Sequence, residues 1–232
     1  MIPSIVLAGG LGTRLRAVSG DTPKPLVTIG SRPFLEYVLD TLVNAHVPAI
    51  FLATSYRWHL FREHFGDTYH GVPLLYSVED EPLGTGGAVH KCFQDNQFTT
   101  ALVLNGDTLF KISLDALVDT HFTRNSALTL ALRSVPDASR YGRVTCGSDQ
   151  RILTFEEKGV HQPGLINGGT YVIDRSAFQH TSLPRKFSLE TDLLQRCVAS
   201  IRPLGIVCND YFIDIGIPDD FRRAQTELYS AS

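Results

Sequence analysis

The chain is organised around Ile5-Val6-Leu7-Ala8-Gly9-Gly10-Leu11-Gly12-Thr13-Arg14-Leu15 and the Pro23-Lys24-Pro25-Leu26 segment that follows it. Residues 5–7 are apolar, which is typical of a buried strand. Glycines follow where that strand would end, and without Cβ atoms they let backbone N–H groups approach an anion closely. Arg14 offers a planar fork for phosphate oxygens, and Lys24 adds a second cation between two prolines. This stretch therefore predicts a binding site for a polyphosphate.

Two other phosphate motifs do not fit this stretch. A Walker A loop needs Gly-Lys followed by Ser or Thr, and the chain has no Gly-Lys pair. A dinucleotide fingerprint needs a third glycine where Leu15 stands, and an acidic residue near Gly30-Ser31-Arg32. A glycine turn after a first strand is also ordinary loop chemistry in α/β proteins. Arg14 and Lys24 favour a functional site over that alternative.

Composition excludes several other classes of protein. The chain has 232 residues and a formal net charge of −3, so it offers no electrostatic case for binding nucleic acid. No apolar run approaches the ~18 residues of a membrane span, and no signal peptide precedes the first strand. The four cysteines are scattered, which favours reduced thiols and a cytoplasmic location. Without a linker or an internal repeat, one domain over residues 1–232 is expected.

The remaining chain alternates apolar runs with amphipathic stretches. Strands are expected at residues 49–53, 72–78, 101–104 and 127–132, with a hairpin at 142–145 and 152–155. Helices are expected at residues 33–45, 58–65, 88–93, 115–123 and 219–228.

Two aspartates stand out as candidates for binding a cation. Asp107 follows the most apolar of these strands in Asn105-Gly106-Asp107, where an α/β sheet places its ligands. It is a hard oxygen ligand that suits Mg²⁺, although an Asp that caps the following turn is the common alternative. Asp214 is a lone carboxylate in an apolar run, so burial requires a partner for it. That partner is a metal, a helix cap or an ion pair.

The motif Gly-x-Gly-Thr-Arg-Leu followed by Pro-Lys-Pro-Leu resembles the sugar-1-phosphate nucleotidyltransferases, most closely those that are heptose 1-phosphate guanylyltransferases. Ala17 stands where that family usually has a proline. The resemblance implies an α/β fold with a single Rossmann-like, mostly parallel mixed sheet and helices on both faces. Residues 1–110 would mainly bind the nucleotide, and residues 111–232 would mainly bind the sugar phosphate.

The resemblance also assigns site residues. The nucleotide would contact Leu7, Ala8, Gly9, Gly10, Gly12, Thr13, Glu79, Gly84, Thr85 and Asp107. The sugar phosphate would contact Gly142, Glu157, Lys158, Asn167, Gly168 and Glu190. Asp107 and Asp214 would bind Mg²⁺. From the residues alone, three glycines with Thr85 at a helix start favour close approach of a ligand. The alternative for Glu156-Glu157-Lys158 is a solvated hairpin end, and the alternative for Ser188 with Thr191 and Asp192 is plain helix capping.

Together these residues predict an enzyme that joins a nucleoside triphosphate to a sugar 1-phosphate and releases pyrophosphate. Arg14 would hold the leaving β- and γ-phosphates, Lys24 the α-phosphate and Lys158 the acceptor. The resemblance favours GTP and D-glycero-D-manno-heptose 1-phosphate, for synthesis of a capsule or lipopolysaccharide. The alternatives are a uridylyl- or thymidylyltransferase that acts on a hexose 1-phosphate, a non-catalytic nucleotide-sugar binding protein, and a dehydrogenase. The oligomeric state stays open.

Overall fold

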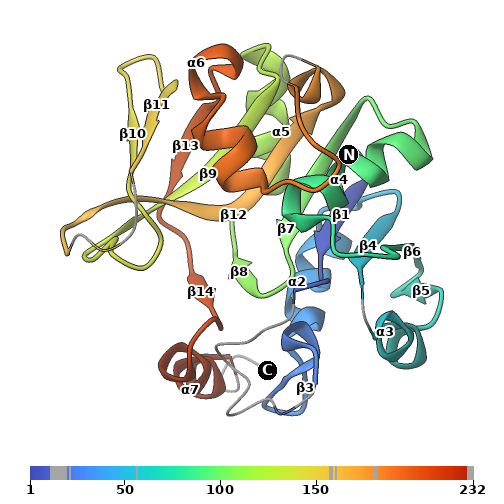
Figure 1. Ribbon diagram of the computed structural model, residues 1–232. Coiled ribbons are helices and arrows are strands. Elements are labelled where there is room, and N and C mark those ends of the chain that lie inside the picture. The colour runs from blue at the N-terminus through green and yellow to red at the C-terminus, as the bar shows by residue number, and fades with distance from the viewer. Residues whose placement is uncertain are drawn as a thin grey trace.

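A ten-stranded mixed sheet forms the centre of the molecule. The computed structural model describes residues 1–10, 20, 22–55, 57–156, 159, 161–179 and 182–228. The strands of the sheet are β1 Ser4–Leu7, β4 Ile50–Thr54, β5 Thr68–Tyr69, β6 Val72–Val78, β7 Thr100–Asn105, β9 Leu128–Val135, β10 Val144–Cys146, β11 Ile152–Phe155, β12 Gly164–Asp174 and β13 Leu204–Cys208. Their order is β11-β10-β12-β7-β1-β4-β6-β5, with β9 paired to β12 and β13 paired to β9 (Figure 1).

The central strands β6, β4, β1 and β7 run parallel to one another. Beyond them, β12 runs antiparallel to both β7 and β9, and β10 and β11 form the predicted antiparallel hairpin. The predicted α/β fold with a mixed sheet is therefore confirmed. The apolar strand predicted at 101–104 is β7, and it lies between β1 and β12 inside the sheet.

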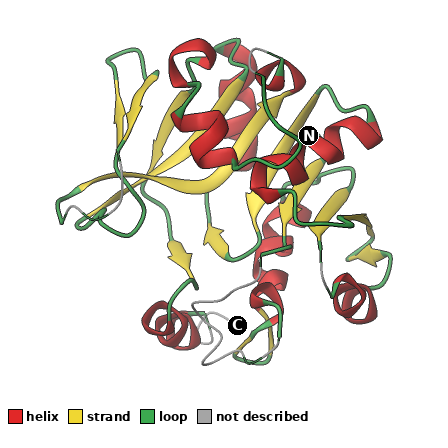
Figure 2. Cartoon of the chain, in the orientation of Figure 1, coloured by secondary structure: helices red, strands yellow, loops and turns green. Residues whose placement is uncertain are grey.

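Helices cover both faces of the sheet because neighbouring side chains of each strand point in opposite directions (Figure 2). On β1, Val6 packs into one hydrophobic cluster and Ile5 into the other. The first cluster lies under α2 Phe34–Asn44, α3 Trp58–Phe65, α5 Leu114–Thr123 and α7 Pro218–Glu227. The second lies under α4 Gly84–Asn96, the π-helix η3 Leu189–Gln195 and α6 Val198–Ile201.

Most predicted helices match the structure, but α4 is longer than predicted. It begins at Gly84 and ends at Asn96, whereas the pattern placed a helix only at 88–93. Glycine is a poor helix former, so residues 84–87 carry no periodic helical signal. The helix starts there because the amides of Gly86 and Gly87 both donate to the Phe187 carbonyl, a contact with a distant segment. The hydrophobic pattern of the sequence therefore did not predict the N-terminus of α4, because a tertiary contact determines where this helix begins.

Shorter elements complete the fold. They are the 3₁₀ helices η1 Lys24–Leu26 and η2 Arg175–Phe178, and the strand pairs β2 Thr28–Ile29 with β3 Arg32–Pro33 and β8 Thr108–Phe110 with β14 Phe212–Asp214. Of these, the β8–β14 pair bears on the candidate site, because it leaves the sheet at the end of β7 and lies toward α7 (Figure 1).

The four cysteines are free thiols, as predicted. Cys92 is buried, and its burial raises the pKa of the thiol to about 11, so it stays protonated at neutral pH. Within the described part of the chain, no helix has the length and apolar character to cross a membrane.

Candidate functional site

The carboxyl ends of three parallel strands meet at one edge of the sheet. Leu7 at the end of β1 lies opposite Ala53 of β4 and Asn105 of β7. The predicted nucleotide residues Leu7, Ala8, Gly9 and Gly10 therefore occupy this edge. The other residues predicted on this loop, Gly12, Thr13 and Arg14, lie outside the described residues.

The turns at this edge are held tightly together by the backbone. Gly106 donates from its amide to the Leu7 carbonyl at 2.9 Å, and a Cβ at Gly106 would lie 2.8 Å from that same oxygen. Ser55 donates from its hydroxyl to the Gly9 carbonyl at 2.7 Å. Because no side chain fits between Gly106 and Leu7, the turn that carries Asp107 stays directly beside the glycine loop.

Lys24 lies between the two aspartates that the sequence selected. Its ammonium is 2.5 Å from Asp107 Oδ2 and 3.5 Å from Asp214 Oδ1. The side chain of Lys24 is 11% exposed, that of Asp214 19% and that of Asp107 36%, so the cluster is open to ligand at Asp107. The ion-pair alternative for Asp214 is therefore present in the structure, and all three predicted residues meet.

The β8–β14 pair explains how two distant aspartates meet. Asp107 directly precedes β8, and Asp214 ends β14 opposite Thr108. The amide of Ile215 donates to the Asp107 carbonyl at 3.1 Å, which continues the pairing past Asp214. The backbone pairing thus brings residues 107 and 214 next to each other, and Lys24 contacts both of their carboxylates.

Asp214 lies in surroundings that favour added positive charge. Burial, and next the negative charge of Asp107, raise the pKa of Asp214, whereas the cations Lys24 and Arg140 act in the opposite direction. The amide of Gly216 also donates to Asp214 Oδ1, at 2.7 Å. Two carboxylates that repel each other and share one ammonium form a site for cations or for the metal complex of an anion.

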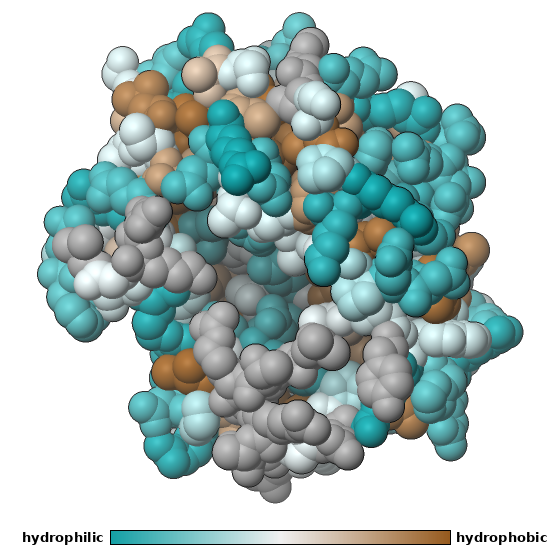
Figure 3. All heavy atoms as spheres, viewed as in Figure 1, coloured by the Kyte–Doolittle hydropathy of each residue, from teal (hydrophilic) through white to brown (hydrophobic). Residues whose placement is uncertain are grey.

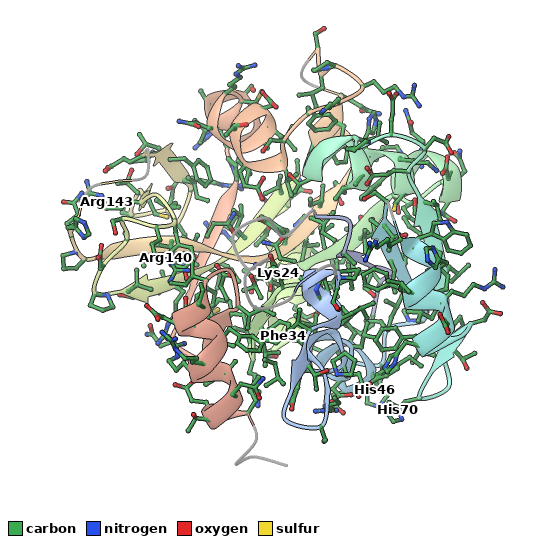
Figure 4. The ribbon with its side chains drawn as sticks, turned by 60° about the horizontal axis from the view of Figure 1, so that its bottom comes forward. Lys24, Phe34, His46, His70, Arg140 and Arg143 are labelled. Carbon is green, nitrogen blue, oxygen red and sulfur yellow. The ribbon has the colours of Figure 1, made fainter. Side chains whose placement is uncertain are left out.

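Arg140 is a further cation of this cluster that the sequence reasoning missed. Its guanidinium is 3.9 Å from Asp214 Oδ2 and makes a short ion pair with Asp220 at the start of α7. Figure 4 shows Arg140 on the same side of the molecule as Lys24, while Arg143 lies further out along the hairpin. The available signal was its place two residues before Gly142, which the family resemblance had already selected.

The first turn of α4 packs closely against residues 185–189. A Cβ at Gly84 would lie 2.5 Å from the Phe187 carbonyl oxygen, and one at Gly86 would lie 2.2 Å from the Phe187 ring. A Cβ at Gly87 would lie 2.7 Å from the Arg185 carbonyl oxygen. A side chain at any of these three positions would overlap with another part of the chain. Packing within the protein therefore explains why glycine stands there.

Glu79 and Thr85 are engaged within this same region. Glu79 Oε2 accepts from the Leu83 amide at 2.8 Å, although burial is the larger effect and raises the pKa of Glu79. Thr85 donates from its hydroxyl to Glu190 Oε2 at 2.8 Å. The structure therefore joins a residue predicted for the nucleotide to a residue predicted for the sugar.

The predicted sugar residues lie on β12 and on the segments beside it. Asn167 donates from Nδ2 to the hydroxyl of the fully buried Tyr171 at 2.7 Å, and its Oδ1 accepts from the Gly169 amide at 3.0 Å. A Cβ at Gly168 would lie 2.5 Å from the Phe110 ring of β8. Gly142 has a φ of +80° and lies two residues before the first residue of the hairpin strand β10. Glu157 and Lys158 lie outside the described residues.

The face that carries these residues is hollowed near its middle. Figure 3 shows the hollow among hydrophilic residues, where Figure 1 places β8. Within the ranges that the structure describes, no group of three or more His, Cys, Asp or Glu is arranged to hold a metal ion. The charged cluster at this edge is therefore a pair of carboxylates with Lys24 and Arg140.

Comparison with known proteins gives consistent matches over nearly the whole chain. A family model described as nucleotidyl transferase matches residues 3–231. The D-glycero-alpha-D-manno-heptose 1-phosphate guanylyltransferase of Aneurinibacillus thermoaerophilus is 42% identical over 225 residues, which cover 97% of each chain. The protein of that name from Campylobacter jejuni is 40% identical and is covered over 96% of its length. The crystal structure of HddC from Yersinia pseudotuberculosis complexed with GMP-PN has a TM-score of 0.86 at 33% identity, covering 98% of this chain and 100% of that one.

Proposed function

This chain belongs to the nucleotidyl transferase family, and on that premise we propose that it transfers GMP from GTP to D-glycero-α-D-manno-heptose 1-phosphate. The products are GDP-heptose and pyrophosphate. Support comes from two relatives of at least 40% identity that carry this name and from the structural match to a protein complexed with GMP-PN. A cytoplasmic location is part of the proposal, since all four cysteines are free thiols.

The reaction depends on neutralising the negative charge of the phosphates, and it does not need a nucleophile from the protein. The acceptor phosphate is already anionic, and its oxygen attacks the α-phosphorus in line with the leaving pyrophosphate. Two anions must meet, and negative charge grows on the leaving group. Positioning and charge neutralisation therefore account for most of the catalysis.

The observation that carries the proposal is the contact of one ammonium, that of Lys24, with both Asp107 and Asp214. Lys24 supplies a fixed positive charge at the edge of the sheet, where the glycine loop after β1 also lies. In the proposed reaction it stabilises the α-phosphate. Arg14 would do the same for the β- and γ-phosphates, and Lys158 for the acceptor phosphate.

The two carboxylates fit a divalent cation such as Mg²⁺. Proteins usually bind Mg²⁺ through one or two carboxylates, with substrate phosphates and waters as the other ligands. Asp107 and Asp214 supply that number of carboxylates close to one cation, and both present hard oxygen atoms. When bound, the ion neutralises phosphate charge beyond what Lys24 supplies alone. Asp107 and Asp214 would hold it.

Asn167, Gly168, Glu190, Gly142 and Glu157 are proposed to bind the sugar phosphate. The bulge between Asn167 and Tyr171 leaves the polar amide of Asn167 at the end of the regular pairing with β9. Leu7, Ala8, Gly9, Gly10, Gly12, Thr13, Glu79 and Gly84 are proposed to bind the nucleotide. This division gives residues 1–110 mainly to the nucleotide and residues 111–232 mainly to the sugar phosphate.

A pyrophosphate-release screen tests this function. The purified protein is incubated with each of five nucleoside triphosphates and with several sugar 1-phosphates, including heptose, mannose and glucose 1-phosphates. We expect release above background with GTP and heptose 1-phosphate in the presence of Mg²⁺. Turnover with UTP or dTTP and a hexose 1-phosphate would replace the proposed substrates but keep the reaction. Absence of release with every pair would refute the enzyme itself.

A further inference from the structure

We propose that Thr85 is a positioning residue for the acceptor sugar, which it serves by holding the carboxylate of Glu190. The inference rests on the proposed function, in which Glu190 contacts the sugar. It gives Thr85 a role on the sugar side, whereas the sequence placed this residue against the nucleoside.

The hydroxyl of Thr85 contacts both residue 189 and residue 190. Its single proton is donated to Glu190 Oε2 at 2.8 Å, and its oxygen accepts from the Leu189 amide at 2.9 Å. A threonine hydroxyl has one proton to give. With that proton committed to a carboxylate, Thr85 has no further donor to offer a ribose hydroxyl or a base.

Glu190 is held from a second direction as well. Ser188 donates from its hydroxyl to the same oxygen, Oε2, at 3.0 Å. Both bonds therefore fix Oε2, and neither involves Oε1. Hydrogen bonds to an ionised carboxylate are stronger than those between neutral groups, so this arrangement fixes the rotamer of Glu190.

Glu190 and Asn167 are both residues that the proposed function assigns to the sugar. Burial, and next the negative charge of Glu190, raise the pKa of Tyr171. The hydroxyl of Tyr171 accepts from Asn167 Nδ2 at 2.7 Å. A carboxylate accepts hydrogen bonds and an amide both donates and accepts them, so Glu190 and Asn167 together suit sugar hydroxyls.

The backbone around Thr85 is shaped to bring its side chain to Glu190. The Phe187 amide donates to the Leu83 carbonyl at 2.9 Å, and the Gly86 and Gly87 amides donate back to the Phe187 carbonyl at 3.1 and 3.2 Å. These bonds fix the start of α4 against the start of η3. The N-terminal amides of α4 at Gly86 and Gly87 are consequently occupied by a protein carbonyl.

The test compares the variants Thr85→Val and Thr85→Ser in the pyrophosphate-release assay. Valine keeps the shape of threonine but loses both hydrogen bonds, whereas serine keeps the hydroxyl. We expect Thr85→Val to raise the KM for the sugar 1-phosphate by about tenfold or more, the effect of losing a hydrogen bond to a charged group. The KM for the nucleotide should change less than about twofold, and Thr85→Ser should restore most of the sugar affinity.

Two controls separate this role from loss of structure. Thr120→Val removes a threonine hydroxyl that bonds only within its own helix, to the Ala116 carbonyl, and should leave both KM values unchanged. Hydrogen exchange at the Leu189 amide should become faster in Thr85→Val and stay slow in Thr85→Ser, because that amide donates to Thr85. A Leu189 amide that exchanges equally slowly in all three proteins contradicts the contact.

The outcomes distinguish this inference from the proposed function. If the wild type is active and Thr85→Val raises the KM for the nucleotide instead, the positioning role is wrong while the function stands. If the wild type turns over a different nucleotide and sugar, the same comparison is made with that pair. A wild type that releases no pyrophosphate with any pair refutes the proposed function, and this inference with it.

Discussion

Lys24 donates from its ammonium to Asp107 at 2.5 Å, although 83 residues separate the two in the sequence. The contact joins the loop before α2 to the end of the central strand β7, and Asp214 approaches the same nitrogen at 3.5 Å. One cation therefore lies where three distant segments converge. Its charge has a structural role in balancing two carboxylates and, in the proposed reaction, a role at the phosphate.

Replacing Lys24 by methionine should lower kcat by on the order of 10²-fold or more, because a fixed charge at the reacting phosphate is lost. Pyrophosphate release measures the effect, and far-UV circular dichroism checks that the fold is kept. Lys91→Met is the matched control, since Lys91 pairs with Asp95 on the exposed side of α4. Wild-type turnover in Lys24→Met would remove this residue from the mechanism.

Asp107→Asn should abolish the Mg²⁺-dependent part of turnover, and Asp214→Asn should act in the same direction. An amide keeps the shape of the carboxylate but loses the charge that a hard cation requires. The measurement is the rate of pyrophosphate release as a function of Mg²⁺ concentration. Asp95→Asn, on the exposed pair with Lys91, serves as a control. If Asp107→Asn reaches the wild-type rate at the same Mg²⁺ concentration, the metal assignment is wrong.

Gly84→Ala should destabilise the protein more than Gly71→Ala. Both glycines have positive φ, +76° and +83°, so a Cβ costs about 1 kcal/mol of backbone strain at either position. At Gly71 the added Cβ meets nothing within 4 Å, whereas at Gly84 it meets the Phe187 carbonyl oxygen at 2.5 Å. The overlap should cost roughly 1–3 kcal/mol more. Urea unfolding of the two variants measures the difference, and equal stabilities would contradict the close contact.

Local patterns predicted the elements that lie inside the sheet and its helices. The apolar runs around Val6, Leu52 and Val103 are buried strands, and the helix at 58–65 matches α3 at both ends. These elements have a strong hydrophobic period, and the sheet confirms them. The strand β13 was not predicted, because Leu204–Cys208 is short and includes a glycine, which is a weak strand former. In the structure it pairs with β9 along its length.

The sequence predicted which residues belong to the site, but not which of their side chains contact one another. Asp107 and Asp214 were selected from the family resemblance and from their apolar surroundings, and the structure places both at Lys24. The contacts of Arg140 with Asp214 and of Thr85 with Glu190 join segments far apart in the chain. The hydrophobic period of a single helix or strand gives no information about contacts between distant segments. The positions predicted at Arg14 and Lys158 stay predictions, as both residues lie outside the described ranges.

Stability should fall as the pH is lowered from 7 toward 5, and His121 should cause part of that loss. Burial lowers the pKa of His121 and outweighs its contact with Asp174 at 3.3 Å. The unfolded chain takes up a proton near pH 6.5, whereas the folded protein does so only at lower pH. Between those values the unfolded state binds more protons, so acid favours unfolding.

Urea unfolding at several pH values measures this dependence. The variant His121→Gln cannot titrate, so its stability should depend less on pH than that of the wild type. His90 has a pKa lowered by burial and by Arg175, so His90→Gln should show a similar but separate reduction. A variant with the same pH slope as the wild type would exclude the histidine that it replaces.

Arg140→Met should lower kcat more than Arg223→Met, although both arginines pair with Asp220. Arg140 reaches from Asp220 to Asp214, 3.9 Å away, while Arg223 contacts Asp220 at 3.2 Å and the Phe212 carbonyl at 3.0 Å. Arg223 lies on α7 itself, so Arg223→Met removes a pair within that helix and a bond to β14, whereas Arg140→Met removes a pair that ties α7 to the segment before β10. Only Arg140→Met also removes a cation from beside Asp214. We expect a loss on the order of tenfold or more in kcat for Arg140→Met, measured by pyrophosphate release, and partial recovery in Arg140→Lys. Equal losses in the two methionine variants would contradict a role for the Arg140 charge beside Asp214, because of the two arginines it is Arg140 that lies beside that carboxylate.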